Sequence, residues 1–295
     1  MGLSRAGLAD DRASKDISMT EKYSISLFGL MAFLALATSA HAQDAPASPE
    51  ASAYAISGNV AVTSDYMFRG LTQTWGGPAI QGGGDLTMTN GLAAGFWASS
   101  ISDKSYPGAA LELDLYASFG TAFNDDWSWR AGIYGYIYPN GNLDDAGLPS
   151  RSFNTVEANG ALTWKWLTLK YSYALTDYFG IDTEQGYKDD SKRTGYLQLD
   201  AAIPLNDQWS VALHAAHTDI PTRLVTPLAN GASNPSYSDF GATLKYQFAP
   251  HWNVSGGGTF ANNDAFYRHS VSFSDANDTR DIGGTRGFVM LQGNF

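Results

Sequence analysis

The sequence predicts an all-β fold, an antiparallel up-and-down transmembrane β-barrel of about twelve strands with short periplasmic turns and long extracellular loops. Three observations predict it. Segments of roughly ten residues alternate apolar and polar side chains, as half-buried strands do. The connections between these segments alternate between short and long. Aromatic residues also gather at the segment ends. A soluble β-sandwich gives no reason for loops to sort by length in this way.

The composition fits such a barrel and argues against several other classes. The 295 residues include 31 Gly, 16 Tyr and 8 Trp but no Cys, and the net charge is −11. Mean hydropathy is only −0.22, and the apolar runs of about 20 residues that helical membrane proteins need are missing. Without Cys, disulfides and thiolate metal sites are excluded. The acidic balance leaves no basic stripe for phosphates, so we expect no nucleic-acid partner.

An export signal precedes the predicted barrel. A short apolar core from Ile25 to Leu36 follows Lys22, and Ala40-His41-Ala42 has the small residues that suit signal peptidase. The core is too short for a spanning helix, although a buried amino-terminal helix is an alternative. No Cys follows the cleavage site, which excludes a lipoprotein anchor.

The chain therefore divides into three parts. We expect a signal peptide with an extended leader in residues 1–42, whose true start is either Met1 or Met19. Residues 43–53 are rich in Ala, Pro and Ser and are expected to form a disordered lead-in. Residues 54–295 are expected to form the barrel.

The strands are placed where the alternation runs. Leu111, Leu113 and Leu115 alternate with Glu112 and Asp114, and two carboxylates on one strand face cannot point at lipid. The expected strands are 54–69, 79–88, 92–100, 109–119, 127–138, 152–162, 167–174, 195–203, 209–217, 237–248, 252–261 and 286–295.

The first of these strands is expected to place Tyr66 and Phe68 on the apolar face of Ile56, Val60 and Val62. Between the second and third strands, Thr89-Asn90-Gly91 predicts a tight turn, because Asn-Gly supplies the positive φ that such turns need.

Aromatic residues are expected to form two rings at the two membrane interfaces. The ring at the short-turn ends comprises Phe119, Trp127, Trp164, Trp166, Trp209, Phe248, Trp252 and Phe295. The ring near the long-loop ends comprises Tyr66, Phe68, Tyr138, Tyr178 and Phe179. The alternative is that the Trp residues fill the core of a sandwich.

The last strand ends on Phe295, which is also an expected assembly signal. This ending resembles the terminal strand of bacterial outer-membrane barrels, in which the barrel-assembly machinery reads a terminal Phe. The alternative is an ordinary sheet strand that happens to end in Phe.

Several motifs carry a wider resemblance. They are Ser64-Asp65-Tyr66-Met67-Phe68-Arg69-Gly70, Thr72-Gln73-Thr74, Gly77-Pro78-Ala79-Ile80-Gln81-Gly82-Gly83, Gly95-Phe96-Trp97-Ala98-Ser99, Val156-Glu157 and Asp177-Tyr178-Phe179-Gly180. With them the chain resembles the TorF-family porins, also named Gcw_chp, from about residue 54 to Phe295. Met67 departs from the β-branched residue expected there, and the leader is longer than usual. The resemblance implies a barrel in the cell outer membrane more firmly than it implies transport.

The polar faces of the strands are expected to line a lumen. Seven acidic residues oppose five basic ones, which predicts a slight negative excess and a weak cation preference. The acidic residues are Asp65, Asp85, Glu112, Asp114, Glu157, Asp200 and Asp239, and the basic ones are Arg69, Arg130, Lys170, Lys245 and Arg286. A barrel of this size should be narrow and partly plugged by Tyr116, Tyr134, Tyr136 and Tyr196.

This interpretation predicts passive diffusion of small hydrophilic solutes through a barrel surrounded by outer-membrane lipid, without a cofactor, metal or catalytic residue. Three alternatives stay open. One is a closed barrel whose interior charges pair, and another is a surface protein acting through its long loops. The third is an outer-membrane hydrolase. His214 near Ser210, and His269 with Asp264, are its only candidate pairs, and no Gly-x-Ser-x-Gly elbow is present. The acidic loop stretches Asp189-Asp190 and Asp275 to Asp281 are candidates for Ca²⁺, although acidic loops are more often solvated.

Overall fold

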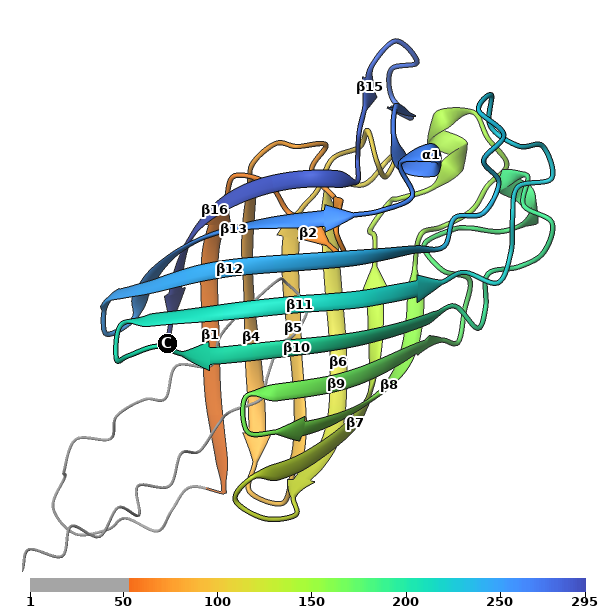
Figure 1. Cartoon of the computed structure of the whole chain (residues 1–295). Helices are drawn as coiled ribbons and strands as arrows, with labels where there is room; N and C mark the ends of the chain where they lie inside the picture. The colour runs from red at the N-terminus through yellow and green to blue at the C-terminus, as the bar shows by residue number, and fades with distance from the viewer. Residues whose placement is uncertain (1–52) are drawn as a thin grey trace, which may run out of the picture.

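The computed structural model describes residues 53–295, which form a closed antiparallel barrel of twelve strands (Figure 1). The expected signal peptide in residues 1–42 and all but the last residue of the lead-in lie outside the described residues. The wall strands are β1 (Tyr54–Thr63), β4 (Ala79–Met88), β5 (Leu92–Ser100), β6 (Leu111–Ala122), β7 (Trp127–Ile137), β8 (Thr155–Trp164), β9 (Leu167–Ala174), β10 (Gly195–Pro204), β11 (Trp209–Asp219), β12 (Tyr237–Ala249), β13 (Trp252–Ala261) and β16 (Gly284–Asn294).

The wall strands pair in the order in which they follow one another, and the ends of the series meet. β1 pairs with β16, with Val60 opposite Gly293 and Val62 opposite Leu291. Beyond this ladder, the Gly58 and Phe295 amides each donate a 2.9 Å bond to the other residue's carbonyl. Closure leaves the wall no free edge that would recruit another strand. Across residues 53–295, no helix has the length and apolarity needed to cross a membrane.

The connections sort by length into two ends of the barrel, as the sequence predicts (Figure 1). The short turns are 89–91, 123–126, 165–166, 205–208 and 250–251, and the long connections are 64–78, 101–110, 138–154, 175–194, 220–236 and 262–283. The predicted Asn90-Gly91 turn forms, with Gly91 at φ +95°. Short elements within the long connections are β2 (Met67–Phe68), β3 (Leu71–Thr72), η1 (Leu143–Ala146), η2 (Thr183–Gln185), α1 (Asp264–Tyr267), β14 (Ser270–Val271) and β15 (Thr279–Arg280).

The predicted strand bounds hold to within three residues except at the first strand. The alternation predicts that this strand runs to Arg69, but it leaves the wall after Thr63. Residues 64–78, here called the inward segment, then turn into the barrel and form the β2–β3 hairpin. Tyr66 and Phe68 are therefore only 2% and 7% exposed, so their predicted outward orientation is wrong. The physical reason is the hairpin, whose left-handed turn at Arg69 (φ +47°) and Gly70 (φ +76°) a strand does not contain. The hairpin packs Tyr66 on Trp97 and Phe68 on Tyr136.

The wall has an apolar outer face and a polar inner face. Outward side chains such as Ile56 and Leu199 are exposed, whereas Gln198 and Asp200, the neighbours of Leu199 along the strand, are buried. All eight members of the predicted aromatic ring at the short-turn ends are exposed, from Trp164 at 36% to Phe295 at 62%. This arrangement is what a lipid bilayer requires of a spanning sheet.

The predicted aromatic ring at the long-loop ends is wrong. Tyr138 and Tyr178 are buried, as are Tyr66 and Phe68, and Phe179 is partly buried against them. The long connections fold over the barrel mouth and enclose these rings. Exposed aromatics close to the long-loop ends of the strands are instead Tyr171, Tyr173, Phe240 and Phe260.

Candidate functional site

The charged residues predicted to line the lumen lie in two kinds of place. Asp65 and Arg69 belong to the inward segment rather than to the wall. The others lie on wall strands, and they range from fully buried to partly exposed. These are Asp85 on β4, Glu112 and Asp114 on β6, Arg130 on β7, Glu157 on β8, Lys170 on β9, Asp200 on β10, Asp239 and Lys245 on β12, and Arg286 on β16.

The inward segment crosses the barrel from one wall to the other. It follows β1, yet Arg69 bonds to Glu157 on β8. In the closed strand order, β8 lies five strands from β1 in one direction and seven in the other. The two strands are therefore almost diametrically opposed, so the segment spans the interior.

The Arg69 side chain ends in a cage of four wall and loop residues. Its guanidinium donates two hydrogen bonds to the Glu157 carboxylate, of 2.9 and 2.7 Å. It also donates to the hydroxyls of Tyr178 at 3.1 Å and Tyr136 at 3.4 Å. Its central carbon lies 4.1 Å from the centre of the Tyr196 ring. We call Tyr136, Glu157, Tyr178 and Tyr196 the guanidinium cage. A two-bond contact with a carboxylate is the strongest form of this ion pair and compensates for its burial.

The start of the inward segment is anchored on the near wall. Arg286 on β16 donates two hydrogen bonds, of 3.0 and 2.7 Å, to the Asp65 carboxylate. The hydroxyls of Thr72 and Thr74 donate to the other oxygen of Asp65 at 2.5 and 3.0 Å. The segment is thus held by one ion pair at each side of the barrel.

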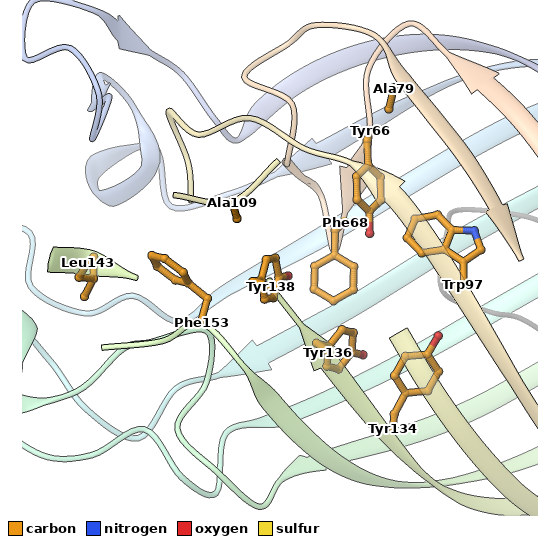
Figure 2. Close-up of a cluster of buried hydrophobic side chains, with 10 residues drawn as sticks. All are labelled: Tyr66, Phe68, Ala79, Trp97, Ala109, Tyr134, Tyr136, Tyr138, Leu143 and Phe153. Carbon is orange, nitrogen blue, oxygen red and sulfur yellow. The ribbon is translucent and has the colours of Figure 1, made fainter. Parts of the chain in front are cut away.

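Aromatic rings fill the space around the segment in the long-loop half of the barrel. Figure 2 shows Phe68 beside Tyr136 and Tyr66 beside Trp97, with ring centres 5.6 and 5.3 Å apart. One cavity beside the segment measures about 10 Å³, room for about one water molecule. Its lining residues are Thr63, Asp65, Tyr66, Met67, Gln81, Phe288 and Met290.

The short-turn half of the interior is less filled. Here Asp85, Tyr116 and Arg130 keep partial exposure to solvent. The Tyr116 hydroxyl donates to Asp85 at 2.7 Å, and Arg130 donates to Ser118 at 2.9 Å. Of the tyrosines predicted to plug the lumen, Tyr134, Tyr136 and Tyr196 are buried and Tyr116 is partly exposed.

His214 joins two carboxylates inside the barrel. Its Nδ1 lies 2.5 Å from Asp200 and its Nε2 lies 2.9 Å from Asp239 and 3.0 Å from the Tyr196 hydroxyl. These contacts place the histidine in an ionic network rather than beside a nucleophile. Within residues 53–295, no group of three His, Asp or Glu side chains is arranged to hold a metal ion.

The loops at the mouth are joined through Asp278, which lies between β14 and β15. Lys104 Nζ contacts the Asp278 carboxylate at 2.6 Å, and the Trp75 indole N–H donates to it at 3.1 Å. The hydrogen bonds from Lys104 and Trp75 hold the pKa of Asp278 below its usual value. Farther along the mouth, burial raises the pKa of Tyr187 to about 12.

Sequence reasoning missed the role of Tyr178 and the course of the inward segment. The sequence predicts Tyr178 at a membrane interface, but the residue is 5% exposed and contacts Arg69. The one signal in the sequence was Gly180. In the structure, Phe179 and Gly180 have φ +49° and +78°, and this left-handed pair turns the chain back over the barrel. Gly180 in the sequence permits such a turn, although glycine alone does not require it.

Solved structures with some likeness to this chain include two porins. The KdgM porin has a TM-score of 0.48 at 10% identity, covering 81% of this chain and 99% of its own. The NanC porin has a TM-score of 0.46 at 13% identity, covering 81% and 98%. OprD from Pseudomonas aeruginosa has a TM-score of 0.35 at 15% identity, covering 74% and 61%. Likenesses this weak carry no inference about function.

No curated protein matches the chain. The family model described as "Bacterial protein of unknown function (Gcw_chp)" matches residues 47–295, which include every wall strand and the whole inward segment. The chain belongs to the Gcw_chp family.

Proposed function

We propose that this protein is a porin-like barrel of the bacterial outer membrane that lets small hydrophilic solutes diffuse through it, with a weak preference for cations. The observation that carries the proposal is the division between an apolar outer face and a charged inner one. A lipid-facing sheet needs the first, and a path for polar solutes needs the second. The resemblance to TorF-family porins points in the same direction. We assign it no enzymatic activity and no cofactor.

The preference for cations rests on the charges inside the barrel. Seven acidic and five basic residues are predicted to line the lumen, so the predicted excess is acidic. His214 reduces this excess when it is protonated. Carboxylates along a path lower the cost of bringing a cation into it.

Transport on this proposal requires the inward segment to move, because the segment and its aromatic neighbours fill the long-loop half. A closed structural barrel is therefore the second candidate, and the filled interior is the observation that favours it.

Planar-bilayer recording of the refolded mature chain in a salt gradient separates the two. Discrete conductance steps with a reversal potential biased toward the cation support the pore. A barrel that inserts, migrates differently after heating and stays silent under all voltages would support the closed barrel instead. Reversal at zero or toward the anion would remove the cation preference alone.

Two further proposals concern biogenesis. We propose that residues 1–42 direct export and that Phe295 is read by the barrel-assembly machinery. The Phe295 side chain is 62% exposed, and its ring stacks on His251 with centres 5.7 Å apart. Replacing it (Phe295→Ser) should reduce the folded fraction in cells while leaving refolding into detergent intact. Equal folded fractions in cells for the variant and the natural chain would remove this role.

A further inference from the structure

The guanidinium cage has the make-up of a ligand-binding site, and its occupant does not belong to the wall. Glu157 supplies a carboxylate with both oxygens engaged, and Tyr136 and Tyr178 supply hydroxyl oxygens as further acceptors. Tyr196 supplies an aromatic face. All four residues are at most 5% exposed. Arg69 reaches them from a loop that crosses the interior.

The cage specifies the chemistry of what it binds. A planar cation with a fork of N–H donors matches a carboxylate at two points, and it also stacks on an aromatic ring. The two hydroxyls accept two of the three remaining N–H donors. A metal ion can bind a carboxylate through both oxygens, but it has no planar face to stack on the Tyr196 ring. An anion would be repelled by the Glu157 carboxylate. A guanidinium group satisfies all of these contacts at once, as Arg69 does.

We propose that the guanidinium cage is a binding site for guanidinium-bearing solutes, and that Arg69 occupies it as an internal substitute for such a solute. A solute that enters the cage takes over the contacts of Arg69 and releases the far end of the inward segment. The segment stays tethered to the near wall by Asp65 and Arg286. The claim that the cage binds such solutes does not depend on transport. Only the claim that their binding opens a path through the barrel rests on the proposed function.

The exchange replaces each contact of Arg69 with an equivalent one, so the contacts themselves balance, and the remaining cost is the freedom that the solute loses on binding. Breaking the Arg69–Glu157 pair without replacement would leave a buried carboxylate uncompensated, which is strongly unfavourable. A solute that brings the same group removes that penalty. Neutral solutes of the same size offer no such compensation.

The binding test removes the Arg69 side chain from the cage and adds a free guanidinium compound to take its place. The Arg69→Ala barrel is refolded in detergent and its thermal unfolding is followed with millimolar methylguanidinium. We expect a saturable rise in Tm. A barrel that also carries Glu157→Gln should need a concentration higher by about 30-fold or more, because the buried charge loses its partner. Adding Glu184→Gln instead, on an exposed residue of the same long connection as Tyr178, should leave the response unchanged.

Either of two kinds of result would overturn the binding claim. One is the absence of a saturable rise in the Arg69→Ala barrel, with heat-modifiable mobility showing that it is folded. The other is an equal response with Glu157→Gln, or with an equal concentration of potassium in place of methylguanidinium.

The permeation test uses the natural chain in a planar bilayer. Methylguanidinium should raise the fraction of time spent conducting, and it should have little such effect on Arg69→Ala, whose cage is already vacant. Conductance without any response to methylguanidinium would overturn the coupling of the cage to opening and keep the pore. Saturable binding in a barrel that never conducts would keep the site and overturn the pore.

Discussion

Asp278 shows how one carboxylate holds the mouth of the barrel together. Its hydrogen bonds from Lys104 and Trp75 lower its pKa below the ordinary value of 3.8. The pKa of Asp278 is lower in the folded chain than in the unfolded one, so the contact stabilises the fold fully at pH values above the ordinary pKa. This stabilisation disappears as the pH falls through the folded pKa. The loop contact should therefore be constant from pH 7 to about 5 and weaken only below about 4.

The indole of Trp75 reports this transition because it bonds to Asp278 directly. We expect its fluorescence to change below about pH 4 in the natural chain, and to be already altered at pH 7 in Asp278→Asn. Asp275→Asn, on an exposed neighbour in the same loop, should behave as the natural chain. A transition near pH 6 would contradict the lowered pKa.

Glu157 is an interior residue whose substitution should carry a large penalty. Glu157→Gln removes the negative partner of a buried guanidinium, which costs about 3–5 kcal/mol when nothing else compensates. The expected result is a lower free energy of unfolding in urea, together with faster proteolysis of the inward segment. Glu184→Gln, which is exposed, should change either measurement little. An unchanged unfolding free energy for Glu157→Gln would mean that Arg69 does not depend on this carboxylate.

For single residues, the sequence predicted which charged side chains lie inside the barrel better than it predicted which of them pair. Arg69 and Glu157 both follow from alternation as interior charges, because each sits on the polar face of a strand-like stretch. Their pairing does not follow, because it joins positions 88 residues apart across the barrel. Only the course of the inward segment brings them together.

Among the elements, the inward segment passes β12 and β13 most tightly at Gly70. Gly70 has φ +76°, and a Cβ there would lie 2.6 Å from Cβ of Asp239 and 3.0 Å from Cβ of Ala261. Gly147 has nearly the same φ, +74°, and a Cβ at that position would have nothing within 4 Å. The two sites therefore separate backbone strain from steric clash.

We expect Gly70→Ala to cost about 1–3 kcal/mol more than Gly147→Ala, because both substitutions strain the backbone but only the first overpacks the interior. Urea unfolding of the two barrels measures the difference. Faster cleavage within residues 64–78 should accompany Gly70→Ala only. Equal unfolding free energies would show that the segment can shift away from β12 at no cost.

The strands were predictable because each has an apolar outer face and a polar inner face, which gives the sequence a period of two. The inward segment was not, because Tyr66 and Phe68 continue that period after the chain has left the wall. An aromatic side chain suits a lipid-facing position and a packed interior equally well. The left-handed turn at Arg69-Gly70 distinguishes the two, and a period cannot reveal it.

For the whole molecule, the sequence predicts the position of the aromatic side chains at one end of the barrel but not at the other. Short turns are too short to fold over the barrel end, so the aromatic side chains beside them stay on the outer surface. The ring at that end was therefore predictable. Long connections can fold over the mouth, and here they enclose Tyr138 and Tyr178. The aromatic content of a long connection therefore says little about its depth in a membrane.

The outer face offers the most direct test that the wall meets lipid. Leu199 lies near the middle of β10 and is 43% exposed, with no interior partner to lose. Leu199→Arg should cost about 2–4 kcal/mol in lipid vesicles, whereas Leu205→Arg, in a short turn at the membrane edge, should cost about 0–1 kcal/mol. Urea titration of both barrels in vesicles and in detergent micelles provides the comparison. Equal costs at the two positions would mean that the middle of β10 does not lie at the centre of a bilayer.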